Sequence, residues 1–132
     1  MLFFRKRKQT FNPYLKKIPN VRSLPFKIIN INEAAENIIN KNLTGLVIID
    51  VRSNREYNIA HVKGAINIPI NNINKYNKNL PQNKDTKIII YCSSGNLAVK
   101  GAYLLSYMGY NNLYIWEGGS INSMIPKNLV IG

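Results

Sequence analysis

Five short runs rich in Ile and Val recur along the chain, and stretches with helical or polar character separate them. The runs are KIINI (27–31), LVIIDV (46–51), AINIPI (65–70), KIIIY (87–91) and LYIW (113–116). Runs of this length that alternate with helices are typical of buried strands in a parallel sheet. The sequence therefore predicts an α/β fold in which helices cover both faces of a parallel sheet.

Two helices are expected in the first half of the chain. Asn32 is expected to cap a helix whose first turn contains Glu33 and Glu36. Ser53 and Glu56 have the spacing of a capping box, which predicts that a short helix begins there.

Two more helices are expected in the second half. The apolar residues of segment 73–80 predict a weak helix that ends near Pro81. The stretch LAVKGAYLLSYM (97–108) gives a clearer signal, and Gly109 is a suitable stop. Its apolar stripe at helical spacing consists of Ala98, Gly101, Ala102, Leu105 and Met108.

Basic residues are concentrated at the start of the chain. The net charge is +12, and residues 1–30 hold eight of the 18 basic side chains and no acidic one. Three prolines and the lack of a sustained hydrophobic period indicate that residues 1–26 are an arm or linker, so we place the domain at residues 27–132. The arm could contact an anionic surface, nucleic acid or an acidic protein. The alternative is a solvated tail that keeps the protein soluble.

The chain has one cysteine, Cys92, and one histidine, His61. These two residues can form neither a disulfide framework nor a metal site rich in thiolate or imidazole, so no metal or other cofactor is expected. No apolar stretch approaches the roughly 20 residues that span a bilayer, and the start of the chain lacks the order of a signal peptide. We therefore expect a protein of the reducing cytoplasm.

Cys92 follows the apolar run 87–91 directly and precedes the small, polar stretch SSGN (93–96). In an open parallel sheet, ligands bind beyond the carboxyl ends of the strands, where loops lead into helices. The N–H groups of such a loop can surround an anion, and the helix expected from about Leu97 adds its positive end. This environment favours the nucleophilic thiolate. The alternative is a buried cysteine that only fills space.

Five motifs follow one another along the chain, and together they are more specific than any one of them. They are Asp50-Val51-Arg52, Glu56-Tyr57, AHVKGAINIP (60–69), YCSSGN (91–96) and GYNNLYIWEGG (109–119). In this order they resemble the successive signatures of a single rhodanese domain. The resemblance implies a five-stranded parallel sheet flanked by helices, with the cysteine in a loop between a strand and a helix.

The resemblance also implies an activity. In rhodanese-like proteins the cysteine accepts a sulfane sulfur as a persulfide and passes it to a thiol or another nucleophilic acceptor. Cys92 is then the catalytic residue. The residues expected to form the substrate-binding loop around it are Ser93, Ser94, Gly95, Asn96 and Leu97.

Four further residues are expected to support the site structurally. The resemblance implies that Asp50, Arg52 and Glu56 form an ion-paired brace beside the active loop. His61 is expected to fix a turn of the backbone, because the family signature places it far from the loop.

The loop departs from the family pattern at Ser93 and Leu97, where many active members carry arginine. Without these cations a doubly charged donor such as thiosulfate loses its counter-charge, which favours a persulfide as the donor. Two hypotheses stay open: a sulfurtransferase or persulfide carrier, and a catalytically silent rhodanese-like module that binds a partner. A cysteine phosphatase of related fold is disfavoured, since it needs an arginine to close a longer loop and no arginine follows Arg55.

Overall fold

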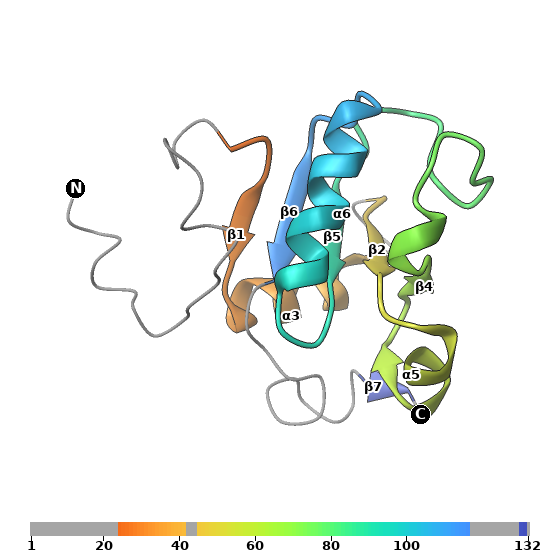
Figure 1. Ribbon diagram of the computed structural model, residues 1–132. Coiled ribbons are helices and arrows are strands. Elements are labelled where there is room, and N and C mark those ends of the chain that lie inside the picture. Colours follow the sequence, from red (N-terminus) through yellow and green to blue (C-terminus); the bar gives the residue numbers. More distant parts are fainter. Residues whose placement is uncertain (1–23, 42–44, 117–129, 132) are drawn as a thin grey trace.

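The computed structural model describes residues 24–41, 45–116 and 130–131, and all five expected runs form strands of one sheet. The strands are β1 (Lys27–Ile29), β2 (Val47–Asp50), β4 (Ile66–Asn67), β5 (Ile88–Tyr91) and β6 (Leu113–Trp116). Their order is β1-β6-β5-β2-β4, and every neighbouring pair is parallel (Figure 1). The predicted five-stranded parallel sheet is confirmed, with β5 at its centre.

A small second sheet was not expected from the sequence. Strand β3 (His61–Val62) pairs antiparallel with β7 (Val130–Ile131), in the register His61 with Ile131. Two-residue strands of this kind carry too little hydrophobic pattern to be recognised from sequence. The pairing brings residues 130–131 beside the segment that follows β2.

Helices cover the two faces of the large sheet, as expected. Helix α6 (Asn96–Tyr107) packs through Ala98, Ala102 and Leu105 on the face that contains Ile90. Helix α3 (Ile31–Ile39) packs on the other face. The buried residues of that second cluster include Ala34, Ile38, Ile48, Ile89, Tyr91 and Trp116. None of the helices in the described ranges is long and apolar enough to cross a membrane.

The first helix begins earlier than expected. Its N-cap is Asn30, and the assignment of Asn32 to this role is wrong. The side chain of Asn30 accepts from the backbone N–H of Glu33, and Glu33 accepts in return from the N–H of Asn30. This reciprocal pairing requires a three-residue spacing, which Asn32 does not have to a Glu or Gln. The expected capping box of Ser53 and Glu56 is present, and it begins α5 (Asn54–Ile59).

The weak helix expected over residues 73–80 does not form, and that prediction is wrong. A single 3-10 turn, η2 (Ile70–Asn72), is followed by turns. Asparagine side chains bond to the local backbone here: Asn74 Oδ1 accepts from the N–H of Tyr76, and Asn77 Oδ1 accepts from the N–H of Asn79. Such bonds compete with the backbone bonds of a helix.

The predicted helix at residues 97–108 is confirmed as α6, and its small residues allow close packing. A side chain at Gly101 would contact the end of Ile73 at 3.3 Å and Val51 at 3.5 Å. Gly109 ends the helix with a positive φ of 99°, a conformation that favours glycine. The glycines therefore set how near α6 lies to the sheet and where it stops.

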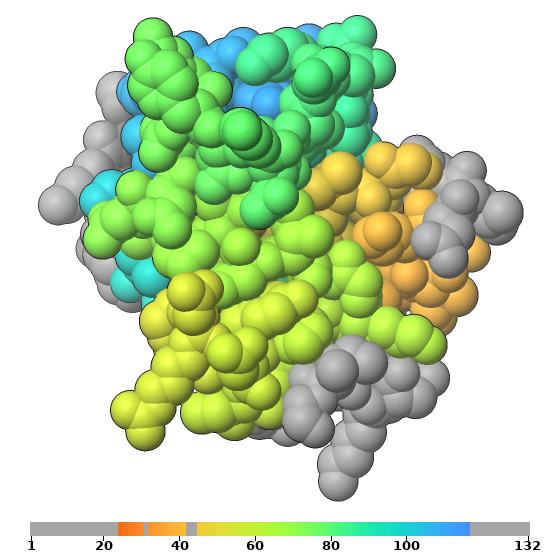
Figure 2. Space-filling view, turned by 90° about the vertical axis from the view of Figure 1, so that its right-hand side faces the viewer, coloured from red at the N-terminus to blue at the C-terminus, as the bar shows by residue number. Residues whose placement is uncertain are grey.

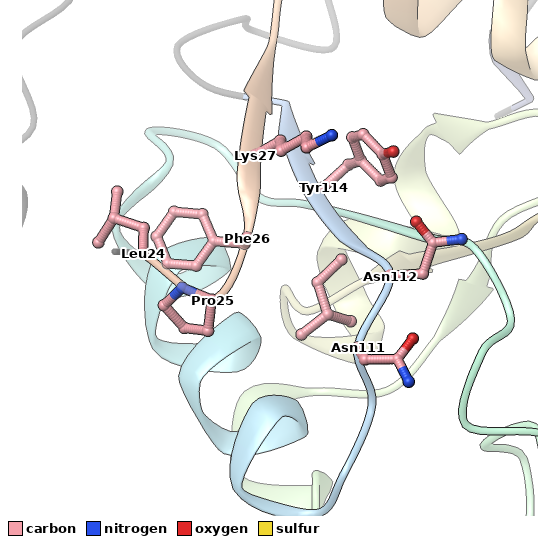
Figure 3. Close-up of a pocket in the computed structure, with 8 residues that line it drawn as sticks. Leu24, Pro25, Phe26, Lys27, Asn111, Asn112 and Tyr114 are labelled. Atoms are coloured by element: carbon pink, nitrogen blue, oxygen red, sulfur yellow. The ribbon is translucent and has the colours of Figure 1, made fainter. Parts of the chain in front are cut away.

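The residues just before β1 pack on the domain. Phe26 is buried, and its ring meets the edge of the Tyr103 ring with centroids 5.5 Å apart. Figure 3 shows Leu24, Pro25 and Phe26 beside the chain at Asn111, where they line a pocket of about 260 Å³. The core therefore includes Phe26, whereas residues 1–23 of the basic arm lie outside the described residues.

The centre of β5 should dominate stability. Ile90 is fully buried, so Ile90→Ala should lower the free energy of unfolding by about 2–5 kcal/mol through lost burial and a cavity. The matched control is Ile59→Ala, since Ile59 is 66% exposed and should change the same quantity by less than about 0.5 kcal/mol. Urea unfolding of both variants measures the difference. Equal losses would contradict this description of the core.

Candidate active site

Cys92 lies directly after β5 and is buried, with 3% of the residue exposed. Two backbone N–H groups point at the sulfur: that of Gly95, with N and Sγ 3.0 Å apart, and that of Ala98, with N and Sγ 3.3 Å apart. Gly95 adopts a positive φ of 89°, which turns the loop sharply into α6. The loop is thus wrapped around the thiol.

The sulfur of Cys92 takes the place of a capping side chain for α6. The N-cap residue is Gly95, which has no side chain to accept a hydrogen bond, and Ala98 lies in the first turn. First-turn N–H groups have no partner inside the helix and carry the positive end of the helix dipole. Because both donors converge on Sγ, they can stabilise negative charge that develops on the sulfur during a reaction.

The other loop residues form the rim around the thiol. Ser93 and Ser94 are exposed, Asn96 is half-buried and Leu97 is 38% exposed. Lys100, one turn further along α6, is also exposed. Among residues 93–97 the rim therefore carries hydroxyl, amide and apolar groups and no cation.

A buried ion pair lies at the end of β2. The carboxylate of Asp50 accepts from Arg52 Nη2 at 2.7 Å and from Nε at 3.0 and 3.1 Å, and both residues are buried. Asp50 also accepts from the backbone N–H of Arg52, and Arg52 Nη2 donates to the carbonyl of Ala60. The pair thereby joins the end of β2 to the chain that leads into β3.

Tyr91, immediately before the cysteine, joins the end of β5 to β3, and the sequence alone did not indicate that it belongs to the site. Its hydroxyl accepts from the N–H of Val62 at 2.9 Å, and the Arg52 guanidinium lies 5.8 Å from its ring centroid. Burial and the nearby charge of Asp50 raise the pKa of Tyr91, so its hydroxyl stays neutral. Its place beside Cys92 at a strand end was the available signal.

Asn67 is a second residue that the sequence did not single out. Its Nδ2 donates to the carbonyls of Asp50 at 2.9 Å and Arg52 at 3.0 Å. It therefore joins β4 to the turn after β2. The signal was its amide within the otherwise apolar run 65–70.

Glu56 and His61 lie apart from the thiol loop. Glu56 is exposed and pairs with Ser53 in the cap of α5, so the buried ion pair consists of Asp50 and Arg52 without the expected third member, Glu56. The ring of His61 stacks on that of Tyr57 with centroids 3.7 Å apart, and Nδ1 lies 2.8 Å from the carbonyl of Tyr57. The structure thus brings Asp50 and Arg52 to the strand ends near Cys92, and it places Glu56 and His61 around α5.

Comparison with known proteins identifies a family. Residues 30–121 match the profile of the Rhodanese-like domain, which is well over half of the chain. This match extends past Trp116 into the final GYNNLYIWEGG motif, of which residues 117–119 lie outside the described residues.

The matches to curated relatives cover only a part of each relative. A tRNA uridine(34) hydroxylase from Bdellovibrio bacteriovorus is 35% identical over 91 residues, which is 67% of this chain and 26% of that protein. A protein of the same name from Cytophaga hutchinsonii is 32% identical over 98 residues, covering 72% of this chain and 31% of its own. The chain therefore spans about a quarter to a third of these relatives.

Solved structures agree on the fold. A rhodanese-related protein from Thermoplasma volcanium has a TM-score of 0.63 and 28% identity, covering 80% of this chain and 98% of its own. An E. coli rhodanese solved with anions has a TM-score of 0.55 and 29% identity, covering 65% of this chain and 96% of its own. An NAD-dependent persulfide reductase from A. fulgidus has a TM-score of 0.56 and 28% identity, and the match covers 74% of this chain and 16% of that protein.

The buried ion pair gives a test of how the site is held. Asp50→Asn leaves Arg52 buried without a counter-charge, so the free energy of unfolding should fall by about 3–5 kcal/mol. Asp85→Asn is the control, because Asp85 is exposed and its acceptor oxygen survives the change. Denaturant unfolding measures both. If the two variants unfold alike, the pair does not hold the strand end.

Proposed function

This chain belongs to the rhodanese-like domain family, and from that premise we propose that it is a sulfurtransferase or persulfide carrier that moves a sulfane sulfur through Cys92. The observation that supports this most is the convergence of the N–H groups of Gly95 and Ala98 on Sγ. Two N–H donors and a helix N-terminus stabilise the negative charge that the sulfur carries when it leaves as a thiolate during transfer. The reaction needs a reduced thiol, which fits the reducing cytoplasm.

The proposed transfer has two balanced steps. The Cys92 thiolate attacks the outer sulfur of a donor persulfide; a new S–S bond forms on Cys92, the donor S–S bond breaks, and its electron pair leaves with the donor thiolate. A nucleophilic acceptor then attacks the outer sulfur on Cys92, and the Cys92 thiolate leaves. No external oxidant or reductant is consumed. The name of the A. fulgidus relative, a persulfide reductase, is in keeping with such a donor.

The rim of the loop bears on the choice of donor. Ser93 and Leu97 offer no positive charge to thiosulfate, and Leu97 presents an exposed apolar side chain instead. A protein or small-molecule persulfide brings less charge to the loop and can gain affinity from contacts elsewhere. We therefore favour persulfides as donors.

A second candidate function is that of a module in tRNA modification. It is favoured by the relatives named tRNA uridine(34) hydroxylase, of which the chain matches about a quarter to a third. The net charge of +12 suits a polyanionic partner, and the basic arm of residues 1–26 is the proposed contact. In this reading the chain positions or supplies one step for a larger activity on tRNA.

Sulfur uptake tests the main proposal. Wild-type protein exposed to a small-molecule persulfide should gain the mass of one sulfur atom, and an acceptor thiol should remove it. Cys92→Ser should gain no mass, because the nucleophile is lost. Ser106→Ala is the control, because Ser106 lies near the far end of α6, outside the loop, and this variant should still load. Intact mass spectrometry reads all three, and a wild type that never loads would favour the silent partner-binding module.

Restoring the loop cations tests the choice of donor. Ser93→Arg with Leu97→Arg should raise turnover of thiosulfate at least about tenfold, since each charge-assisted contact to an anion contributes roughly 1.5–3 kcal/mol. Lys100→Arg is the control, because it keeps a cation one turn away from the loop. The rates with thiosulfate and with a persulfide are measured for each variant. A wild type that already prefers thiosulfate would sink the idea that missing charge selects the donor.

A further inference from the structure

A basic groove lies at the end of α6 away from Cys92. It has a volume of about 600 Å³ and is lined by parts of the segment 75–84 and by Met108 and Tyr110, which follow α6. Cys92 lies at the opposite end of this 12-residue helix, which is about 18 Å long at 1.5 Å per residue. The groove is therefore separate from the candidate active site.

The charged residues that line the groove are all basic. Three of its lining residues are lysines, Lys75, Lys78 and Lys84, and no Asp or Glu is among the described residues that line it. Its other polar lining groups include the neutral amides of Asn77 and Gln82. A groove that concentrates positive charge in this way attracts a polyanion.

Aromatic rings stand beside these lysines. Tyr76 is 78% exposed, and Lys75 Nζ lies 5.2 Å from its ring centroid. Lys84 Nζ lies 4.1 Å from the centroid of Tyr110, a buried ring whose hydroxyl donates to the carbonyl of Pro81. Exposed aromatic faces next to cations are what single-stranded nucleic acids use, because bases stack on the rings and phosphates pair with the lysines.

The wall of the groove has a defined shape although it contains no long helix. Asn74 and Asn77 each donate through Nδ2 to the carbonyl of Asn72, and Leu80 is buried in the core. In Figure 2 the green and blue-green atoms of this segment lie at the top of the face, and blue atoms from the segment after α6 show between them. The lysines and the exposed ring are therefore presented on a supported surface.

We propose that this groove binds a single-stranded stretch of RNA, with Tyr76 as the stacking platform and the three lysines on its phosphates. The choice of RNA rests on the second candidate function above, whereas the single-stranded form rests on the exposed ring of Tyr76. The groove holds the nucleic acid at a site distinct from Cys92.

The test uses the full chain and a fluorescent single-stranded oligoribonucleotide, with binding followed by anisotropy over a range of salt concentrations. Tyr76→Ala should weaken binding at least about fivefold, the loss expected for one stacked base. Tyr107→Ala is the matched control, since Tyr107 is 80% exposed and does not line the groove. Equal affinities for these two variants would overturn the proposal, because RNA held by the basic arm alone would bind equally well whether Tyr76 or Tyr107 is replaced.

Charge is tested separately. Lys75→Gln with Lys78→Gln should flatten the dependence of log affinity on log salt by about 1.4, from two lost phosphate contacts at roughly 0.7 each. Lys63→Gln, at an exposed lysine outside the groove, should leave that slope unchanged. A base-free polyphosphate competitor that binds wild type and displaces the RNA equally well from wild type and Tyr76→Ala would show that the groove recognises charge alone, which also overturns the proposal. A Cys92→Ser variant should keep full RNA binding, so failure of sulfur transfer and failure of this groove are distinguishable.

Discussion

The backbone pairing between β2 and β5 places the chemistry of this domain. The parallel register sets Asp50 opposite Tyr91, so the residues that follow each strand emerge side by side. Arg52 returns to Asp50 from one strand end, and Cys92 leaves from the other. A one-residue slip of either strand would turn Asp50 or Tyr91 to the opposite face of the sheet. The ion pair, the tyrosine contact and the thiol loop all depend on this register.

Much of the fold could be predicted because each central strand is apolar on both faces. The runs at 46–51 and 87–91 are too short for a buried helix and too apolar for an exposed strand, which leaves a covered parallel sheet. Helix α6 was predictable for a related reason, since its small residues recur at helical spacing and Gly109 ends it. Errors arose where short polar side chains decide the local backbone. Glu33 stands at capping-box spacing from Asn30 and not from Asn32. The side chains of Asn74 and Asn77 accept from nearby backbone N–H groups, which favours turns over a helix.

The site was only partly predictable. The place of Cys92 between a strand and a helix could be inferred, since the hydrophobic run stops one residue before it. The convergence of the Gly95 and Ala98 N–H groups on its sulfur depends on how the loop turns, and local sequence does not encode that direction. Likewise, Asn67 meets Asp50 across two strands that are far apart in the sequence. Contacts of this kind arise from strand order, which a single sequence constrains weakly.

Because the sulfur of Cys92 also caps α6, its chemical state and the stability of that helix are linked thermodynamically. A chemical change that makes the sulfur a weaker acceptor destabilises the first turn of α6. By thermodynamic linkage, unfolding of that turn favours the same chemical change by an equal free energy. Protection of the first amides of α6 from hydrogen exchange therefore depends on the chemical state of the sulfur.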